Sequence, residues 1–207
     1  MFEVNQLAVG GFDQNFSYVV HDTESGECLV VDPCGDTELI RAALEKYPDR
    51  VPKYILLTHG HNDHVSGLKQ VRGFFPAPTV CHPTCRIASD VALEHGTKLP
   101  FGKSYIEALF TPGHAVSSIC WLLGDHSAIF TGDTLFIGCC GYCGYCDPGI
   151  MFRTMRDILF PLPDQAVVYS GHDYGEAPAD TLGHQKQVNP YLYIDDLTAF
   201  KKAVRDL

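Results

Sequence analysis

The sequence predicts an α/β protein built from two similar halves. Strand-like and helix-like segments alternate along the first half of the chain, and the second half repeats the pattern. No Pro/Ser-rich or highly charged linker separates the halves, so we expect one domain over residues 1–207, with two packed sheets sharing a core. A chain of 207 residues, 45% of them hydrophobic, is long enough to bury such a core.

Each element follows from its own residues. Helical spacing behind Asp36 predicts a helix over residues 36–47, and further short helices are expected over residues 64–75 and 85–96. Two apolar runs predict a hairpin over residues 118–133. The remaining strands are expected over residues 15–20, 28–33, 53–59, 78–83, 105–113 and 166–170.

The composition narrows the function classes. A formal net charge of −10 leaves no basic surface for nucleic acid or for an anionic membrane. The N-terminus has no basic segment followed by a long apolar one, and no stretch approaches the ~20 apolar residues of a spanning helix, so a cytoplasmic protein is expected. Nine cysteines, an odd number, predict reduced thiols or metal ligands rather than a disulfide framework. A homo-oligomer is left open.

A dense group of metal-ligand side chains marks the end of the strand predicted over residues 53–59. His59 and His61 lie two apart in an extended segment, so their side chains point the same way and can hold one ion. Asp63 and His64 follow in the first turn of the predicted helix, where they face back toward the strand end. Imidazole and carboxylate ligands suit zinc, iron(II) or manganese. The sequence therefore predicts a metal site here.

Three more ligand candidates stand in glycine-bounded loops, each directly after an apolar strand-like run. They are His114, Asp133 and His172. Because side chains at strand ends flanked by glycine gather into sites, we expect these loops to complete the metal site. The other histidines are expected to be structural: His21, His82, His95, His126 and His184.

These four loops, in this order and at this spacing, resemble the metallo-β-lactamase superfamily. The resemblance implies a four-layer αββα sandwich with two divalent ions, zinc or iron, with manganese also compatible. The implied ligand sets are His59, His61 and His114 for one ion, Asp63, His64 and His172 for the other, Asp133 as the bridge, and the buried Asp32 as the acid that orients ligands.

Within the superfamily, the chain is most similar to the short bacterial hydroxyacylglutathione hydrolases (glyoxalase II) and the persulfide dioxygenases. The implied activity is hydrolysis of a small thiol-derived thioester by a hydroxide that bridges the two ions near Asp63 and Asp133. Tyr174 is expected either to donate a hydrogen bond to the oxyanion or substrate, or to pack the site wall. Tyr142 or Tyr145 stands where the family often has an arginine that binds the carboxylate of the thiol cofactor.

Two other functions remain open. A mononuclear iron persulfide dioxygenase would use only His59, His114 and Asp133 as ligands. A noncatalytic metal- or redox-sensing protein would use the crowded thiols of the loop after Asp133, which are Cys139, Cys140, Cys143 and Cys146. We expect these thiols to line that loop without binding the metals of the site, the alternative being a thiolate metal site joined by Cys81 and Cys85.

Overall fold

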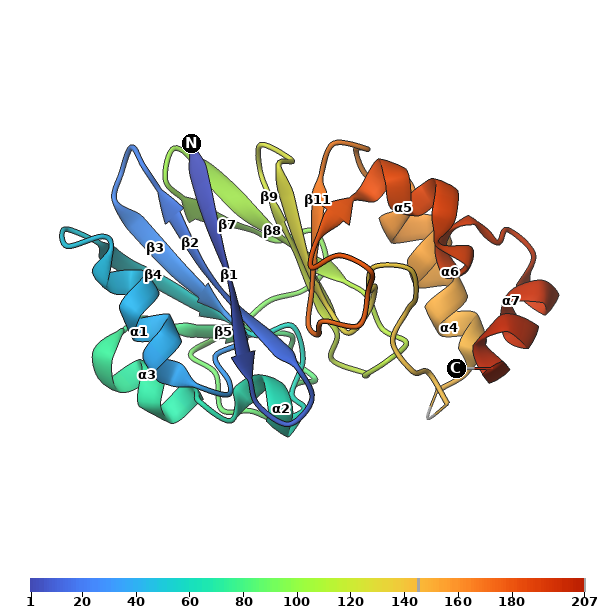
Figure 1. The fold of residues 1–207 in the computed structure, drawn as a ribbon, viewed down its shortest axis with the longest axis horizontal. Coiled ribbons are helices and arrows are strands. Elements are labelled where there is room, and N and C mark those ends of the chain that lie inside the picture. Colours follow the sequence, from blue (N-terminus) through green and yellow to red (C-terminus); the bar gives the residue numbers. More distant parts are fainter. Residues whose placement is uncertain (145, 207) are drawn as a thin grey trace.

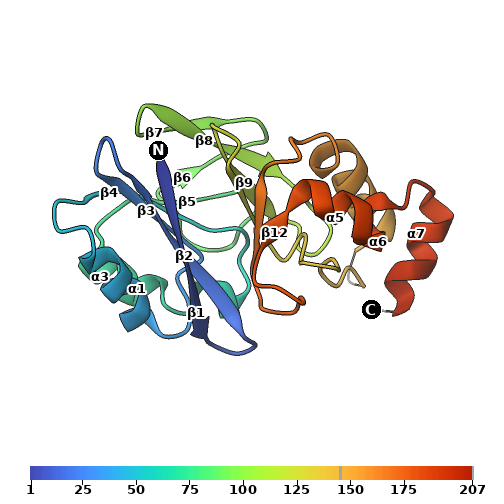
Figure 2. The same ribbon diagram turned by 45° about the horizontal axis from the view of Figure 1, so that its top comes forward.

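Two six-stranded sheets pack face to face in the computed structural model, which describes residues 1–144 and 146–206 (Figure 1). Helices cover the outer face of each sheet, and Figure 2 shows the same layers from a second direction. The result is the four-layer αββα sandwich that the sequence predicts, with each half of the chain supplying one sheet and the helices over it.

The first sheet has the order β1-β2-β3-β4-β5-β6. Its first three strands pair antiparallel, and the pairs from β3 to β6 are parallel. The strands are β1 Phe2–Gly10, β2 Asn15–Asp22, β3 Glu27–Val31, β4 Val51–Leu56, β5 Thr79–Cys81 and β6 Val91–Ala92.

The second sheet has the order β12-β11-β10-β9-β8-β7. All its pairs are antiparallel except the pair of β10 with β11, so β8, β10 and β11 run in the same direction and end at the same edge. The strands are β7 Lys98–Phe101, β8 Ser104–Phe110, β9 Ile119–Leu123, β10 Ala128–Gly132, β11 Val167–Ser170 and β12 Asp180–Thr181.

The helices lie outside the sheets, with α1 and α3 over the first and α4 to α7 beyond the second (Figure 1). Asp36 caps α1 by accepting a hydrogen bond from the Glu38 amide, as the sequence predicts. The helices are α1 Thr37–Glu45, α2 Asn62–Val65, α3 Leu68–Phe74, α4 Pro148–Arg153 continuing into the π-helical η1 Thr154–Leu159, α5 Leu182–Val188, α6 Pro190–Tyr193, and α7 Leu197–Ala203 continuing into the 3₁₀ turn η2 Val204–Asp206.

Three apolar clusters hold the four layers together. The middle cluster joins the sheets through Tyr18 and Phe16 of β2 and Trp121 and Phe130 of β9 and β10. Separate clusters fill the space between the first sheet and its helices, and between the second sheet and its helices. Because the middle cluster draws on both halves of the chain, the two sheets stabilise each other.

Several sequence expectations were incomplete or wrong. The edge strands Phe2–Gly10, Lys98–Phe101 and Asp180–Thr181 were not expected, nor were the helices after residue 147. The helix expected over residues 85–96 does not form: Val91–Ala92 instead pairs in parallel with Val80–Cys81 as an edge strand. The Asp90 carboxylate fixes this course by accepting a hydrogen bond from the Thr79 amide at 2.8 Å, so tertiary pairing overrides the local helical spacing. None of the helices in the described part of the chain is long and apolar enough to cross a membrane.

Candidate metal centre

The four predicted loops meet at one edge of the sandwich. His59 and His61 follow β4, and the other three residues lie just beyond strands of the second sheet that run in the same direction: His114 after β8, Asp133 after β10 and His172 after β11. The strand ends of the two sheets are tied together here, because the Ile119 amide donates to the Thr58 carbonyl at 2.7 Å. The site therefore lies where both halves of the fold meet.

The helix α2 supplies Asp63 and His64. His61, in extended conformation, is the residue before its first turn, so the chain changes from extended to helical within the motif itself. This change turns His64 inward, where its side chain is fully buried, and leaves the Asp63 side chain 25% exposed at the mouth of the site. Asn15 holds the Asp63 carboxylate from the other side through a 3.2 Å hydrogen bond from Nδ2.

The seven predicted ligands lie together. His114 Nε2 is 3.0 Å from His61 Nδ1, and His64 Nε2 is 3.2 Å from His172 Nε2. Asp133 lies between these pairs, with Oδ2 3.4 Å from His114 Nε2 and 3.3 Å from His172 Nε2. Three groups have all their ligand atoms within 4.8 Å of one another: His59, His61 and His114; His59, His64 and Asp133; and Asp63, His64 and His172. Their role as ligands stays a prediction that this convergence supports.

Asp32 holds the rear side of the centre. Its Oδ2 lies 2.9 Å from His64 Nδ1 and accepts the Thr58 hydroxyl at 2.5 Å, while Oδ1 accepts the Thr58 amide at 2.7 Å. The Thr58 oxygen is in turn 3.1 Å from His59 Nδ1. One buried carboxylate thus fixes two imidazoles with their Nε2 atoms directed into the centre, which is how proteins orient metal-binding histidines.

Backbone carbonyls orient two more histidines. His114 Nδ1 lies 3.0 Å from the Tyr142 carbonyl, and His172 Nδ1 lies 2.6 Å from the Asp13 carbonyl. Each of these imidazoles therefore donates its Nδ1 proton outward and directs Nε2 into the centre. The sequence did not indicate Asp13 or Thr58, because both act through backbone or relay contacts from residues that resemble ordinary turn and strand-end residues.

Two glycines make room for the ligands. A Cβ at Gly171 would lie 2.3 Å from Asp133 Oδ1 and 2.6 Å from His64 Cε1. Gly132 has φ +48°, and its Cβ would lie 2.4 Å from Thr58 Oγ1. A side chain at Gly171 would displace the bridging candidate Asp133, and one at Gly132 would displace Thr58.

The donor set fits divalent cations. His59 Nε2 is buried without a hydrogen-bond partner among the described residues, and Asp133 Oδ1, although 3.1 Å from His64 Nε2, is not in hydrogen-bonding geometry with any group there. Burial lowers the pKa of both His59 and His114, which keeps these imidazoles neutral and able to coordinate. Imidazole nitrogens facing each other at 3.0–3.2 Å repel unless a proton or a cation lies between them.

The side of the centre that holds His64 and His172 attracts positive charge. Burial lowers the pKa of His172, but the Asp133 and Asp63 carboxylates outweigh it and raise the pKa to about 9. Burial likewise opposes protonation of His64, yet Asp133 and Asp32 raise its pKa well above the usual value. The carboxylates that favour positively charged imidazoles here also favour a bound cation.

Tyr174 lies over this side of the centre. Its ring stacks on His172 with centroids 4.8 Å apart, and its hydroxyl donates to the Asp13 carboxylate. Burial and this hydrogen bond raise the pKa of the tyrosine. The ring is half exposed, so it both packs the wall and borders solvent. To donate to a substrate, the hydroxyl would have to exchange Asp13 for the new acceptor.

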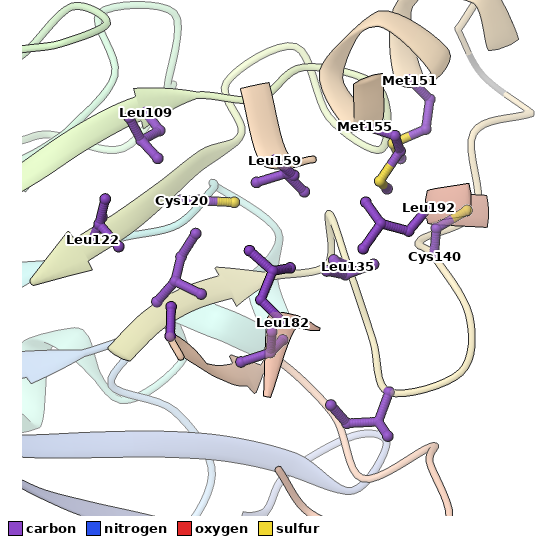
Figure 3. Close-up of a cluster of buried hydrophobic side chains, with 14 of the residues drawn as sticks. Leu109, Cys120, Leu122, Leu135, Cys140, Met151, Met155, Leu159, Leu182 and Leu192 are labelled. Atoms are coloured by element: carbon purple, nitrogen blue, oxygen red, sulfur yellow. The ribbon is translucent and has the colours of Figure 1, made fainter. Parts of the chain in front are cut away.

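The thiols after Asp133 divide into two kinds. Cys140 and Cys143 are buried in the apolar cluster between the second sheet and its helices, where Cys140 appears among leucine and methionine side chains (Figure 3). Cys139 and Cys146 are partly exposed. None of the ligand groups found within the described residues contains a cysteine, and Tyr145 lies outside those residues. Packing accounts for the two buried thiols.

An αββα sandwich with histidines and aspartates at the meeting edge of its sheets defines a class of metal-binding proteins. The sequence profile of the metallo-beta-lactamase superfamily matches residues 10–84. The chain is 32% identical over 191 residues to the probable polyketide biosynthesis zinc-dependent hydrolase BaeB of Bacillus velezensis, covering 87% of this chain and 83% of that protein. The chain belongs to the metallo-β-lactamase superfamily.

Further relatives place it in the branch that the sequence indicates. It is 30% identical over 180 residues to human mitochondrial persulfide dioxygenase ETHE1, covering 86% of this chain and 71% of that protein. It is 32% identical over 195 residues to the hydroxyacylglutathione hydrolase of Salmonella arizonae, covering 91% and 75%. The crystal structure of ETHE1 from Myxococcus xanthus superimposes with a TM-score of 0.86 at 25% identity, covering 99% of this chain and 90% of that one. The relatives thus include both hydrolases and dioxygenases.

Proposed function

We propose that the protein is a binuclear metal-dependent hydrolase that cleaves a thioester of a small thiol. One observation carries the proposal: seven ligand-type side chains converge, and Asp133 lies between a group of histidines on one side and the Asp63 group on the other. A single ion needs three or four protein ligands. Seven converging ligands therefore favour two ions, with zinc or iron as the best-matched metals.

The residues of the chain have distinct tasks in this reaction. When bound, two divalent ions supply Lewis acidity at the carbonyl and a nucleophilic water at neutral pH. The histidine groups would hold the ions, and the Asp133 carboxylate would supply a negative charge to both. Asp63 is held ionised, because the hydrogen bonds and positive charge around it outweigh burial and lower its pKa. It can therefore accept a hydrogen bond from the attacking water and orient it.

Tyr174 has a positioning task in this proposal. By stacking on His172 and hydrogen-bonding Asp13, it braces the same loop whose carbonyl fixes His172. Its half-exposed ring lines a cavity of about 600 Å³ that has room for the thiol half of a substrate. We therefore expect contact with substrate through the ring, and donation by the hydroxyl only after it leaves Asp13.

A mononuclear iron persulfide dioxygenase is the second candidate, and the likeness to the two ETHE1 proteins favours it. His59, His114 and Asp133 would then bind iron, leaving the other four residues around it. The 3.0 Å approach of His61 Nδ1 to His114 Nε2 argues for the hydrolase, because it directs His61 into the same ion site. A noncatalytic redox sensor is disfavoured, because two of its four thiols are buried in the core.

The compartment and the extent of the domain are part of the proposal. All nine cysteines are free thiols, which supports a reducing, cytoplasmic setting. The shared middle cluster supports one hydrolase domain over residues 1–207. The substrate would be a small thiol derivative, with no nucleic-acid or membrane partner.

The test compares two metal forms of the protein on two classes of substrate. The protein reconstituted with zinc should release free thiol from a panel of acyl thioesters, with or without oxygen. Iron-loaded protein given glutathione persulfide should consume no oxygen above background. Oxygen uptake that matches persulfide loss, with no thioester cleavage, would establish the dioxygenase instead.

A further inference from the structure

A cavity of about 400 Å³ opens beside the metal centre on the side of His61 and His114. The loop after β5 forms one wall with Thr84 and Arg86, and Cys146 contributes from the loop after Asp133. Since two candidate ligands line it directly, a group held in this cavity lies next to the reacting bond of a substrate.

Arg86 gives this cavity its charge. Among the described residues that line the cavity, it is the only Lys, Arg, Asp or Glu. The side chain is exposed, and among residues 1–144 and 146–206 it has neither a hydrogen-bond nor an ion-pair partner. In a chain with 25 acidic and 15 basic residues, an unpaired guanidinium beside the centre is free to bind an anion from solution.

The cavity on the Tyr174 side of the metal centre is negatively charged. A larger cavity of about 600 Å³ extends from Tyr174 and is lined by Glu176 and Asp180. The His184 ring in this cavity is tied to Asp180 at 2.6 Å. An anionic group is therefore repelled from this flank and directed to the other one.

We propose that the cavity beside His61 is a carboxylate-binding subsite, in which Arg86 binds a carboxylate of the substrate while the bond to be cleaved lies at the metal centre. The planar fork of a guanidinium matches the two oxygens of a carboxylate, and one arginine balances one negative charge. This inference rests on the proposed hydrolase for the reacting bond. Its substrates are thus thioesters with a carboxylate on the half that faces Arg86.

Binding and turnover can be measured separately. Two non-hydrolysable thioether analogues, identical except that one carries a carboxylate and the other its primary amide, are titrated calorimetrically into zinc-loaded wild-type protein. The same titrations use Arg86→Gln, Arg86→Lys, and Arg205→Gln as a control at an exposed arginine near the C-terminus. Gln keeps a polar side chain with a similar aliphatic stem but is shorter and removes the charge.

The wild type should bind the carboxylate analogue about 5-fold more tightly than the amide, the scale of an exposed ion pair. Arg86→Gln should abolish this preference, Arg86→Lys should keep part of it, and Arg205→Gln should keep all of it. In kinetics, Arg86→Gln should raise KM for carboxylate thioesters and leave kcat for them unchanged. For the neutral thioester, both KM and kcat should stay unchanged.

No preference in the wild type, or an unchanged preference in Arg86→Gln, would overturn the subsite. The hydrolase proposal is judged apart from this, by turnover of the neutral thioester in wild-type protein. A protein that prefers the carboxylate analogue through Arg86 but cleaves no thioester would keep the subsite and lose the hydrolase.

Discussion

Replacing Asp32 by Asn should disturb the metal centre without disturbing the fold. Asn has nearly the same size as Asp and tolerates the left-handed conformation that Asp32 adopts, with φ 47°. The substitution removes the negative charge and one of the oxygens that fix His64 and Thr58 at 2.9 and 2.5–2.7 Å. An amide NH₂ facing His64 Nδ1 would reverse the tautomer and place a proton on the nitrogen that should bind the ion.

The expected loss is about 10- to 100-fold in metal affinity, the usual cost of removing an acid that orients a ligand. A lost charge-assisted hydrogen bond, worth about 1.5–3 kcal/mol, gives the same range. Chelator competition measures the affinity, with Asp22→Asn as the matched control, because Asp22 is equally buried but binds the N-terminal amine and the Ser25 amide. Wild-type affinity in Asp32→Asn would refute the orienting role.

Four further changes have definite expected outcomes. Asp133→Ala should lower thioester turnover about a thousandfold or more, since its carboxylate serves both ions and metal chemistry supplies several kcal/mol; appreciable turnover would exclude a bridging role. Asp63→Ala should reduce metal content from two ions per chain to one by elemental analysis, whereas retention of two would remove Asp63 from the ligand set. Metal affinity should rise with pH up to about pH 9, because His172, with its pKa raised to about 9, must lose its proton to bind; calorimetry in buffers of different ionisation enthalpy should detect the released proton. Replacing Cys143 and Cys146 together by Ser should leave metal content unchanged, whereas loss of an ion would reveal a thiolate site. The same change should lower the free energy of unfolding by about 1–2 kcal/mol, because a hydroxyl replaces the buried Cys143 thiol.

The convergence of the candidate ligands could be predicted in part because the signal of the first group is local and dense. His59, His61 and His64 fall within six residues at a strand end, and the extended-to-helical change that joins them is fixed by neighbouring residues. His114 and His172 carried a weaker signal, a single histidine in a glycine loop. Only the parallel course of β8 and β11 brings them to the same edge.

The residues that orient the ligands were harder to predict, because they act through the tertiary fold. The Asp13 carbonyl reaches His172 across 159 positions of sequence, and a carbonyl has no residue signature. The helix prediction for residues 85–96 was wrong for the same reason. The spacing of the segment suits a helix, but Val91 and Ala92 instead pair with the edge of the first sheet. Arg86, in that segment, lines the cavity beside the metal centre.

A metal titration followed by activity tests the central claim most directly. Metal-free protein receives zinc in steps, and the rate of thioester hydrolysis is recorded at each step under conditions where binding is complete. If Asp133 joins two ions in one catalytic centre, the rate should reach its maximum at two equivalents per chain. A maximum already reached at one equivalent would contradict the binuclear account.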